Sequence, residues 1–205
     1  MIDRNIYLIR HPEVYNPNKL CYGQSEMPLE ENFTVQFDWV KERLQLDENT
    51  TYHSSPLRRC TKLASHLSND NHVTDQRISD FNFGTWEMKE WNEIPAKELN
   101  LWNADFVNHK VKKGECFLDL YERAIDFYEE IVARNHSENT VIITHAGIIR
   151  SVIAYVLDFP LEKVFNLRID YSSISKVSYH HQSDLSSVAY LNLTAEHLKT
   201  REKGL

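Results

Sequence analysis

The stretch Ile6-Tyr7-Leu8-Ile9-Arg10-His11-Pro12 joins an apolar run of four residues directly to a cation and an imidazole. A short apolar run of this kind predicts a buried strand, and ligands of open α/β sheets bind beyond the carboxyl ends of the strands. Two further expected strands lead into similar residues, in Ser55-Pro56-Leu57-Arg58-Arg59 and Val141-Ile142-Ile143-Thr144-His145-Ala146-Gly147. Three strand ends therefore bring Arg and His side chains together, which predicts a pocket for a phosphate dianion.

The rest of the chain alternates between helical and strand-like patterns. Helical spacing predicts helices over 30–46, 58–67, 117–133 and 147–157, and apolar runs predict strands over 6–9, 50–54, 72–74, 141–144, 174–179 and 188–193. This alternation predicts an α/β fold, a three-layer sandwich with a mostly parallel central sheet and helices on both faces. The last two strands, around the polar turn 181–184, are candidates for an antiparallel pair. The length of 205 residues fits one domain, with a polar tail over 194–205.

Composition excludes several classes of partner. A formal net charge of −7 makes nucleic acid and anionic membranes unexpected. The most apolar stretch, 141–157, is too short for a membrane span and contains His145 and Arg150. His180 and His181 are adjacent, so they face opposite sides of a strand, and no third ligand stands at a usable spacing; we expect no metal site.

Cysteine usage and the N-terminal sequence indicate a compartment. The three cysteines, Cys21, Cys60 and Cys116, are odd in number and far apart, which is typical of free thiols in a reducing environment. The polar N-terminal residues lead into only four apolar ones, so no signal peptide fits. We expect a cytoplasmic protein.

The predicted pocket has the groups that phosphoryl transfer needs. Arg10 and Arg59 offer guanidinium forks that match phosphate oxygens. His11 is the candidate nucleophile, because imidazole attacks phosphorus and leaves readily near neutral pH. A protonated His145 would neutralise a phosphate oxygen, helped by backbone amides at the following helix start, beginning with Ala146.

The leaving alkoxide requires a proton donor, and three carboxylates compete for that role. Asp80 precedes the Gly-containing aromatic segment 81–87, which could aim it into the pocket; Glu13 and Glu87 are the alternatives. Each residue taken singly also has a structural explanation, such as a turn for Asp80. The functional interpretation gains weight because several signals share the same strand-end context.

Taken jointly, five motifs resemble the histidine phosphatase superfamily, with its phosphoglycerate-mutase-like fold. They are Arg10-His11-Pro12-Glu13, Ser55-Pro56-Leu57-Arg58-Arg59-Cys60, Asp80-Phe81-Asn82-Phe83-Gly84-Thr85-Trp86-Glu87, Gly114-Glu115-Cys116 and Thr144-His145-Ala146-Gly147. The resemblance implies phosphomonoester hydrolysis through a phosphohistidine, without cofactor or metal. It implies catalytic roles for Arg10, His11, Arg59, Asp80 and His145, and substrate contacts from Arg10, Tyr22, Gln24, Arg59, Glu115 and Ala146.

A finer resemblance concerns the loop Cys21-Tyr22-Gly23-Gln24-Ser25-Glu26-Met27-Pro28-Leu29. It is similar to that of α-ribazole-5′-phosphate phosphatases, which implies a small-molecule phosphate ester of cobalamin biosynthesis as substrate. A broad-specificity sugar-phosphate or phosphoglycerate phosphatase and a catalytically silent phosphate-binding module are the alternatives, and a homodimer is left open. The chain departs from the family pattern at several positions: Pro12 replaces a Gly and removes an amide, Val14 replaces a Thr, the usual downstream Asn is displaced, and Asp80 replaces a longer Glu.

Overall fold

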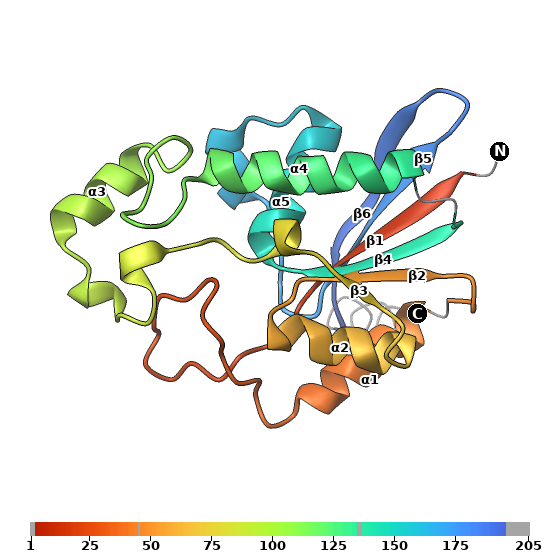
Figure 1. Ribbon diagram of the computed structural model, residues 1–205, viewed down its shortest axis with the longest axis horizontal. Coiled ribbons are helices and arrows are strands. Elements are labelled where there is room, and N and C mark those ends of the chain that lie inside the picture. The colour runs from red at the N-terminus through yellow and green to blue at the C-terminus, as the bar shows by residue number, and fades with distance from the viewer. Residues whose placement is uncertain (1–2, 45, 135–136, 196–205) are drawn as a thin grey trace, which may run out of the picture.

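A six-stranded mixed sheet forms the centre of the computed structural model, which describes residues 3–44, 46–134 and 137–195 (Figure 1). The strands are β1 (Arg4–Arg10), β2 (Thr51–Ser54), β3 (Val73–Thr74), β4 (Asn139–Thr144), β5 (Ile174–His180) and β6 (Leu185–Leu193). Their order across the sheet is β3-β2-β4-β1-β5-β6. The predicted α/β class is confirmed.

The sheet divides into a parallel part and an antiparallel part. The pairs β2–β3, β2–β4 and β1–β4 are parallel, whereas β5 runs antiparallel to both β1 and β6. The antiparallel pairing expected for the last two strands is therefore confirmed. The parallel part also contains all three strand ends singled out by the sequence, so these ends point the same way.

Helices cover both faces of the sheet. They are α1 (Phe33–Leu44), α2 (Arg58–Ser68), α3 (Ala96–Ala104), α4 (Phe117–Arg134) and α5 (Ala146–Leu157), with short 3₁₀ turns at Gln76–Ile78, Gly84–Trp86, Trp91–Glu93 and Leu161–Asn166. Helices α4 and α5 pack on one face, and α1 and α2 on the other (Figure 1). The three-layer arrangement follows from strands that are apolar on both sides.

Alternation along β4 shows how one strand supplies both layers. Ile142 packs into the cluster with α4 and α5, whereas Val141 and Ile143 pack against α1 and α2. All three are buried. Burial of each such side chain stabilises the fold by roughly 1.5–3 kcal/mol, so this strand is held firmly and its carboxyl end is a rigid support.

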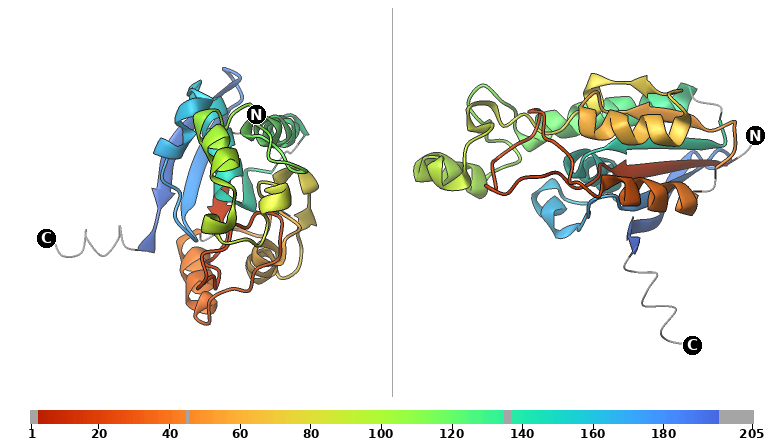
Figure 2. Two further views of the ribbon diagram at one scale, coloured as in Figure 1. Left: turned by 90° about the vertical axis from the view of Figure 1, so that its left-hand side faces the viewer. Right: turned by 90° about the horizontal axis from the view of Figure 1, so that it is seen from below.

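The aromatic segment that follows β3 lies beyond the carboxyl end of β1, at the α3 end of the molecule (Figure 2). Trp86 is 2% exposed and donates from Nε1 to Glu98 on α3 over 2.9 Å, while Trp91 is 40% exposed. Helix α3 was not predicted, because the aromatic residues around it do not repeat with helical spacing. The segment thus combines a packed cluster with one accessible ring.

Three expectations concern the chain as a whole. No helix among the described residues is long and apolar enough to cross a membrane. The three cysteines are free and buried. Of the polar tail expected over 194–205, only Thr194 and Ala195 belong to the described residues.

Candidate active site

The carboxyl ends of β1 and β4 lie at the same level, because Arg10 pairs with Thr144 in their parallel register. His11 and His145 are the next residues, and the His11 amide donates to the Thr144 carbonyl over 2.9 Å. The two imidazole rings are buried and their centroids lie 5.1 Å apart. Strand register therefore brings the two predicted histidines together.

The contacts of His11 leave one ring nitrogen ready to react. Nδ1 lies 2.7 Å from the carbonyl oxygen of Pro12, which favours the tautomer with the proton on Nδ1 and a lone pair on Nε2. Burial, together with the neighbouring His145, Arg59 and Arg10, holds the pKa of His11 well below its ordinary value of 6.5. The ring is therefore neutral near pH 7, the form that a nucleophile needs.

His145 is held between two polar side chains. Its Nε2 lies 2.8 Å from Ser55 Oγ and 3.5 Å from Cys60 Sγ, and its Nδ1 lies 3.2 Å from Asp80 Oδ2. Burial lowers the pKa of His145, although the Asp80 carboxylate opposes that shift. Burial therefore favours the neutral ring in the ligand-free protein, whereas the phosphate contact predicted for His145 belongs to its protonated form.

Arg59 and Asp80 form a nearly enclosed ion pair. Arg59 Nη2 lies 3.0 Å from Asp80 Oδ2, with the Arg59 side chain 0% and the Asp80 side chain 17% exposed. Arg59 also donates to the carbonyls of Gly23 and Ser25. Burial alone would raise the pKa of Asp80, but His145 and Arg59 outweigh it and hold that pKa far below its usual range.

Arg10 is anchored away from the ion pair. Its Nη1 donates to the Ile169 carbonyl over 2.7 Å, and its guanidinium carbon lies 3.7 Å from the centre of the Tyr171 ring. This cation–π contact fixes the plane of the guanidinium. We call Arg10, His11, Arg59, Asp80 and His145 the buried cluster.

Three nitrogens of the buried cluster are buried yet make no well-formed hydrogen bond within the described part of the chain: Arg10 Nε, Arg59 Nε and His145 Nδ1. Buried polar groups are normally satisfied, and exceptions mark functional positions. All three can act as donors, and two belong to cations. Such a set is suited to an anion.

The atoms of His11, Asp80 and His145 that could ligate a metal lie within 4.8 Å of one another. A cation bound there would meet the Arg59 guanidinium, which already contacts the same carboxylate. Like charges at such short range repel strongly where water is excluded. The cluster is therefore better matched to an oxyanion than to a metal ion.

A second pair, Arg123 and Glu115, supports Asp80 from behind. Their charged groups lie 2.7 Å apart. Arg123 Nη2 donates to the Asp80 carbonyl over 2.9 Å, and the Asn82 amide donates to Glu115. The predicted substrate contact of Glu115 is not supported, because its carboxylate is engaged by this pair and by the loop. No sequence pattern indicates the contact of Arg123 with the Asp80 carbonyl, because the two residues lie 43 positions apart in the chain.

Glu87 holds the loop that reaches Arg59. Its carboxylate accepts from the amides of Gly23, Gln24 and Ser25, and also from that of Phe83. These bonds account for Glu87 without an acid–base role, so it is no longer a good candidate for the proton donor. The predicted contact residue Gln24 donates from Nε2 to the Asp80 carbonyl over 3.1 Å.

Gly23 allows this loop to approach the segment of Asp80 closely. A Cβ at this position would meet the Phe81 carbonyl oxygen at 1.7 Å. No side chain can be accommodated at that distance. The loop 21–29 and the Asp80 segment are thus joined by backbone contact, which places Tyr22 beside the buried cluster.

A pocket of 310 Å³ adjoins the buried cluster, and we call it the tyrosine pocket. Its lining residues are Glu13, Val14, Asn16, Lys19, Leu20, Tyr22, Trp91 and Tyr171. The hydroxyls of Tyr22 and Tyr171 lie 2.8 Å apart, and the Tyr171 ring lies 5.5 Å from the His11 ring.

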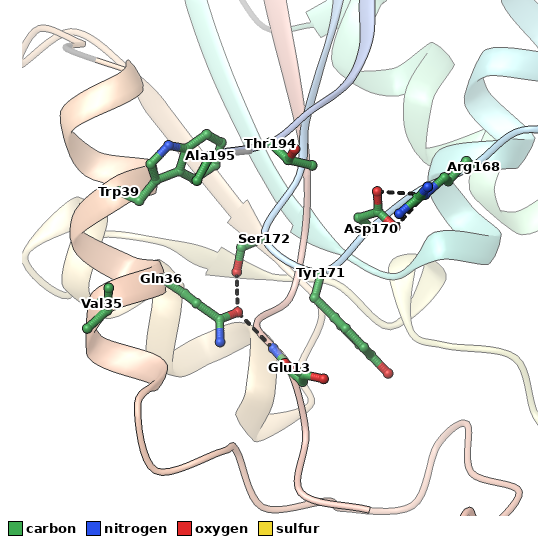
Figure 3. Close-up of a pocket in the computed structure, with 10 residues that line it drawn as sticks. All are labelled: Glu13, Val35, Gln36, Trp39, Arg168, Asp170, Tyr171, Ser172, Thr194 and Ala195. Carbon is green, nitrogen blue, oxygen red and sulfur yellow. Dashed lines mark hydrogen bonds and ion pairs between the residues drawn. The ribbon is translucent and has the colours of Figure 1, made fainter. Parts of the chain in front are cut away.

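A second pocket, of 360 Å³, lies between α1 and the segment before β5 (Figure 3). Gln36 Oε1 accepts there from Ser172 Oγ and from the Glu13 amide, and the Tyr171 ring points away from Trp39. This pocket contains no member of the buried cluster. Tyr171 and Glu13 line both pockets, so they form the boundary between the tyrosine pocket and this second pocket.

The structure brings all five predicted catalytic residues into one cluster. Of the predicted contact residues, Tyr22 and Gln24 lie beside it, and Ala146 opens α5 directly after His145. Amides in the first turn of a helix lack intrahelical acceptors, so they can bind an anion.

A comparison with protein families agrees with this geometry. The family described as histidine phosphatase superfamily (branch 1) matches residues 6–192. The chain belongs to this superfamily. The chain is a phosphomonoesterase of the histidine phosphatase type.

Individual relatives of this histidine phosphatase differ in substrate. Phosphoserine phosphatase 1 of Hydrogenobacter thermophilus is 23% identical over 196 residues, which is 92% of each chain. The adenosylcobalamin/α-ribazole phosphatase of Escherichia coli is 24% identical over 184 residues, 86% of this chain and 91% of that one. The crystal structure of the α-ribazole phosphatase from Shigella flexneri superposes with a TM-score of 0.81 at 22% identity, covering 92% and 96% of the two chains, and it confirms the fold.

Proposed function

We propose that the buried cluster hydrolyses a phosphate monoester through a phosphohistidine on His11. The observation that carries the proposal is the meeting of two guanidiniums, two imidazoles and one carboxylate at the ends of parallel strands. A transferring phosphoryl group spreads negative charge over three oxygens. The donors of Arg10, Arg59 and His145 match that charge, and each essential donor contributes about 3 kcal/mol.

In the first step, Nε2 of His11 attacks phosphorus and forms a P–N bond while the P–O bond to the alcohol breaks. The electron pair of that bond goes to the leaving oxygen, which takes a proton from Asp80. In the second step, Asp80 accepts a proton from water, the water oxygen attacks phosphorus, and the P–N bond breaks to release inorganic phosphate and neutral His11. No cofactor or metal enters either step.

Asp80 is the proposed proton donor because of its position. It is the one candidate carboxylate that contacts members of the buried cluster. Glu13 is the remaining alternative for the proton donor, because it lines the tyrosine pocket. It is exposed and has no contact with the buried cluster among the bonds described above. Activity measured in Asp80→Asn and Glu13→Gln separates the two, since only loss of the acid lowers kcat for substrates with poor leaving groups.

We propose α-ribazole 5′-phosphate, an intermediate of cobalamin biosynthesis, as the most suitable substrate. The aromatic walls of the tyrosine pocket, Tyr22, Tyr171 and Trp91, offer stacking surface for a heteroaromatic leaving group. The E. coli relative carries that substrate in its name. Phosphoserine is a second candidate, because the Hydrogenobacter relative is named for it and because the same pocket offers Lys19 and Glu13 to its carboxylate and amine.

The deciding experiment compares kcat/KM for α-ribazole 5′-phosphate with phosphoserine, sugar phosphates, phosphoglycerates and an aryl phosphate, with EDTA present. We expect a preference of about a hundredfold for α-ribazole 5′-phosphate, equivalent to about 2.7 kcal/mol. Equal, slow rates across the panel would leave the hydrolysis mechanism and remove the substrate assignment. Phosphate binding without any turnover would instead support the silent-module alternative.

A further inference from the structure

A single carboxylate oxygen of Asp80 contacts two of the groups that we propose bind the phosphate, Arg59 and His145. Oδ2 lies 3.0 Å from Arg59 Nη2 and 3.2 Å from His145 Nδ1. One side-chain nitrogen or oxygen atom each of His11, Asp80 and His145 lies within 4.8 Å of the other two. The carboxylate is therefore close to the ring of the candidate nucleophile, His11.

An oxygen that two such donors share is in the position expected for a non-bridging phosphate oxygen. A phosphate bound by Arg59 and His145 within reach of His11 would need that position. The carboxylate and the phosphate cannot occupy it together, because both are anionic and both need the same donors. The contact with His145 is also a poor hydrogen bond, since Nδ1 remains without a well-formed partner within the described residues.

We propose that the Asp80 carboxylate is an autoinhibitory contact: it occupies the donors of Arg59 and His145 in the free protein, and the phosphate of the substrate displaces it. This inference rests on the proposed function. Arg59 and His145 thereby exchange one anion for another, and Asp80 is released toward the leaving group only after a phosphate is bound.

The bonds that hold the residue Asp80 do not involve its Oδ2 oxygen. Its carbonyl accepts from Arg123 Nη2 and Gln24 Nε2, and its Oδ1 accepts from the Phe81 amide over 2.9 Å. These bonds can persist when Oδ2 gives up Arg59 and His145, so the loop keeps its place. The Asp80 side chain is 17% exposed, so part of its surface already borders solvent.

Displacement of the Asp80 carboxylate couples phosphate binding to the uptake of a proton by that carboxylate. The charged and titratable groups around Asp80 are Arg59 and Cys60 on α2, His11 and Arg10 at the end of β1, His145 and Arg150 at α5, Arg123 on α4, and Cys21 and Tyr22 in the first loop. Once the phosphate takes Arg59 and His145, the carboxylate loses its main cationic contacts and faces a dianion instead. Both changes favour the protonated carboxyl, which is the form that donates to the leaving alkoxide.

Tungstate, a tetrahedral dianion that does not titrate near neutral pH, tests the contact by isothermal titration calorimetry. Asp80→Asn should bind tungstate at least tenfold more tightly than the wild type. The matched control is Glu13→Gln, which removes the same charge nearby without touching Arg59 or His145, and should change affinity less than about twofold. The same titrations in two buffers of different ionisation enthalpy measure proton uptake. The wild type should take up more protons on binding tungstate than Asp80→Asn does.

A second variant, Asp80→Ala, is measured in case Asp80→Asn is unstable. The second readout is the rise in Tm that tungstate causes. Both variants should gain a larger rise in Tm than the wild type. The inference is overturned if Asp80→Asn binds tungstate no more tightly than Glu13→Gln, or if it binds more weakly while the wild type binds and hydrolyses normally. If neither wild type nor variant binds tungstate and no substrate is hydrolysed, the proposed function fails as well.

Discussion

The buried cluster and the tyrosine pocket are adjacent, but they are built differently. In the cluster, Arg10, His11 and His145 stand at strand ends whose register is fixed by backbone bonds and by burial on both faces, and Arg59 lies in the first turn of α2. The pocket is lined by residues from loops, including the accessible Trp91 and the hydroxyl pair of Tyr22 and Tyr171. Loops vary more freely than the elements they connect.

This difference separates chemistry from specificity. The rigid cluster suits a reaction that is the same for every phosphate ester, because positioning and charge do most of the catalysis. The loop-borne pocket suits the part of the substrate that changes between relatives. Substitutions in the cluster should therefore lower kcat/KM for all substrates by a similar factor. Substitutions in the pocket should instead change the order of the substrates by kcat/KM.

The largest effect is expected for His11→Asn. Loss of the nucleophile should lower kcat roughly 10⁴-fold or more for every substrate, while the Tm stays near that of the wild type because Asn fills much of the same space. Steady-state kinetics with a melting curve measure both. His66→Asn, which alters a surface histidine beside Asp38, is the matched control; substantial turnover in His11→Asn would break the distinction between the two regions.

The next effect is expected for Arg59→Lys. A lysine keeps the charge but loses the fork that reaches Gly23, Ser25 and Asp80. We expect kcat/KM to fall roughly 100-fold, equally across the substrate panel. Arg58→Lys, one residue away and exposed, should have little effect. A loss at Arg59 that depended strongly on the alcohol would mean that the cluster also reads the leaving group.

A smaller, substrate-dependent effect is expected for Tyr171→Phe. The ring stays on Arg10, so tungstate affinity should not change, but the hydroxyl next to Tyr22 is lost. We expect the ratio of kcat/KM between a nucleoside-like ester and a simple aryl phosphate to change by roughly tenfold. Tyr171→Leu, which also removes the ring, should in addition weaken tungstate binding; a uniform change across all substrates in Tyr171→Phe would contradict a role in specificity.

The smallest effect concerns pH and stability. The pKa values of His11 and His145 are lowered in the folded protein, mainly by burial, so the unfolded chain binds more protons below about pH 6.5. The free energy of unfolding should therefore decrease as the pH falls through that region, by at most about 1.4 kcal/mol per pH unit for each imidazole. Urea titrations at two pH values measure the slope, which His11→Asn should reduce. An unchanged slope would place the titrating groups elsewhere.

The sequence predicted the cluster well because its signals are local. An apolar run followed by Arg10 and His11 indicates a strand end by itself, and the same holds before His145. Parallel strands then align such ends without further information. The choice of Arg59 over Arg58 came from the resemblance, and the structure places Arg59 in the cluster.

Other parts of the site could not be predicted because they depend on contacts between distant segments. The sequence favoured Asp80 but left Glu87 open as an alternative, and only the structure shows that Glu87 binds loop amides while Asp80 binds Arg59 and His145. Arg123 stabilises Asp80 through a contact that no pattern indicates. Tyr171 joins Tyr22 across the site only when the first loop and the last strands have come together.

The most direct test of the central claim is rapid acid-free quenching of the wild type during turnover, followed by mass spectrometry of its peptides. The account predicts a phosphoryl group on the peptide that carries His11, stable in alkali and labile in acid, which forms with every substrate that is hydrolysed and disappears in His11→Asn. Turnover with no phosphorylated peptide, or with the phosphoryl group on another residue, would contradict it.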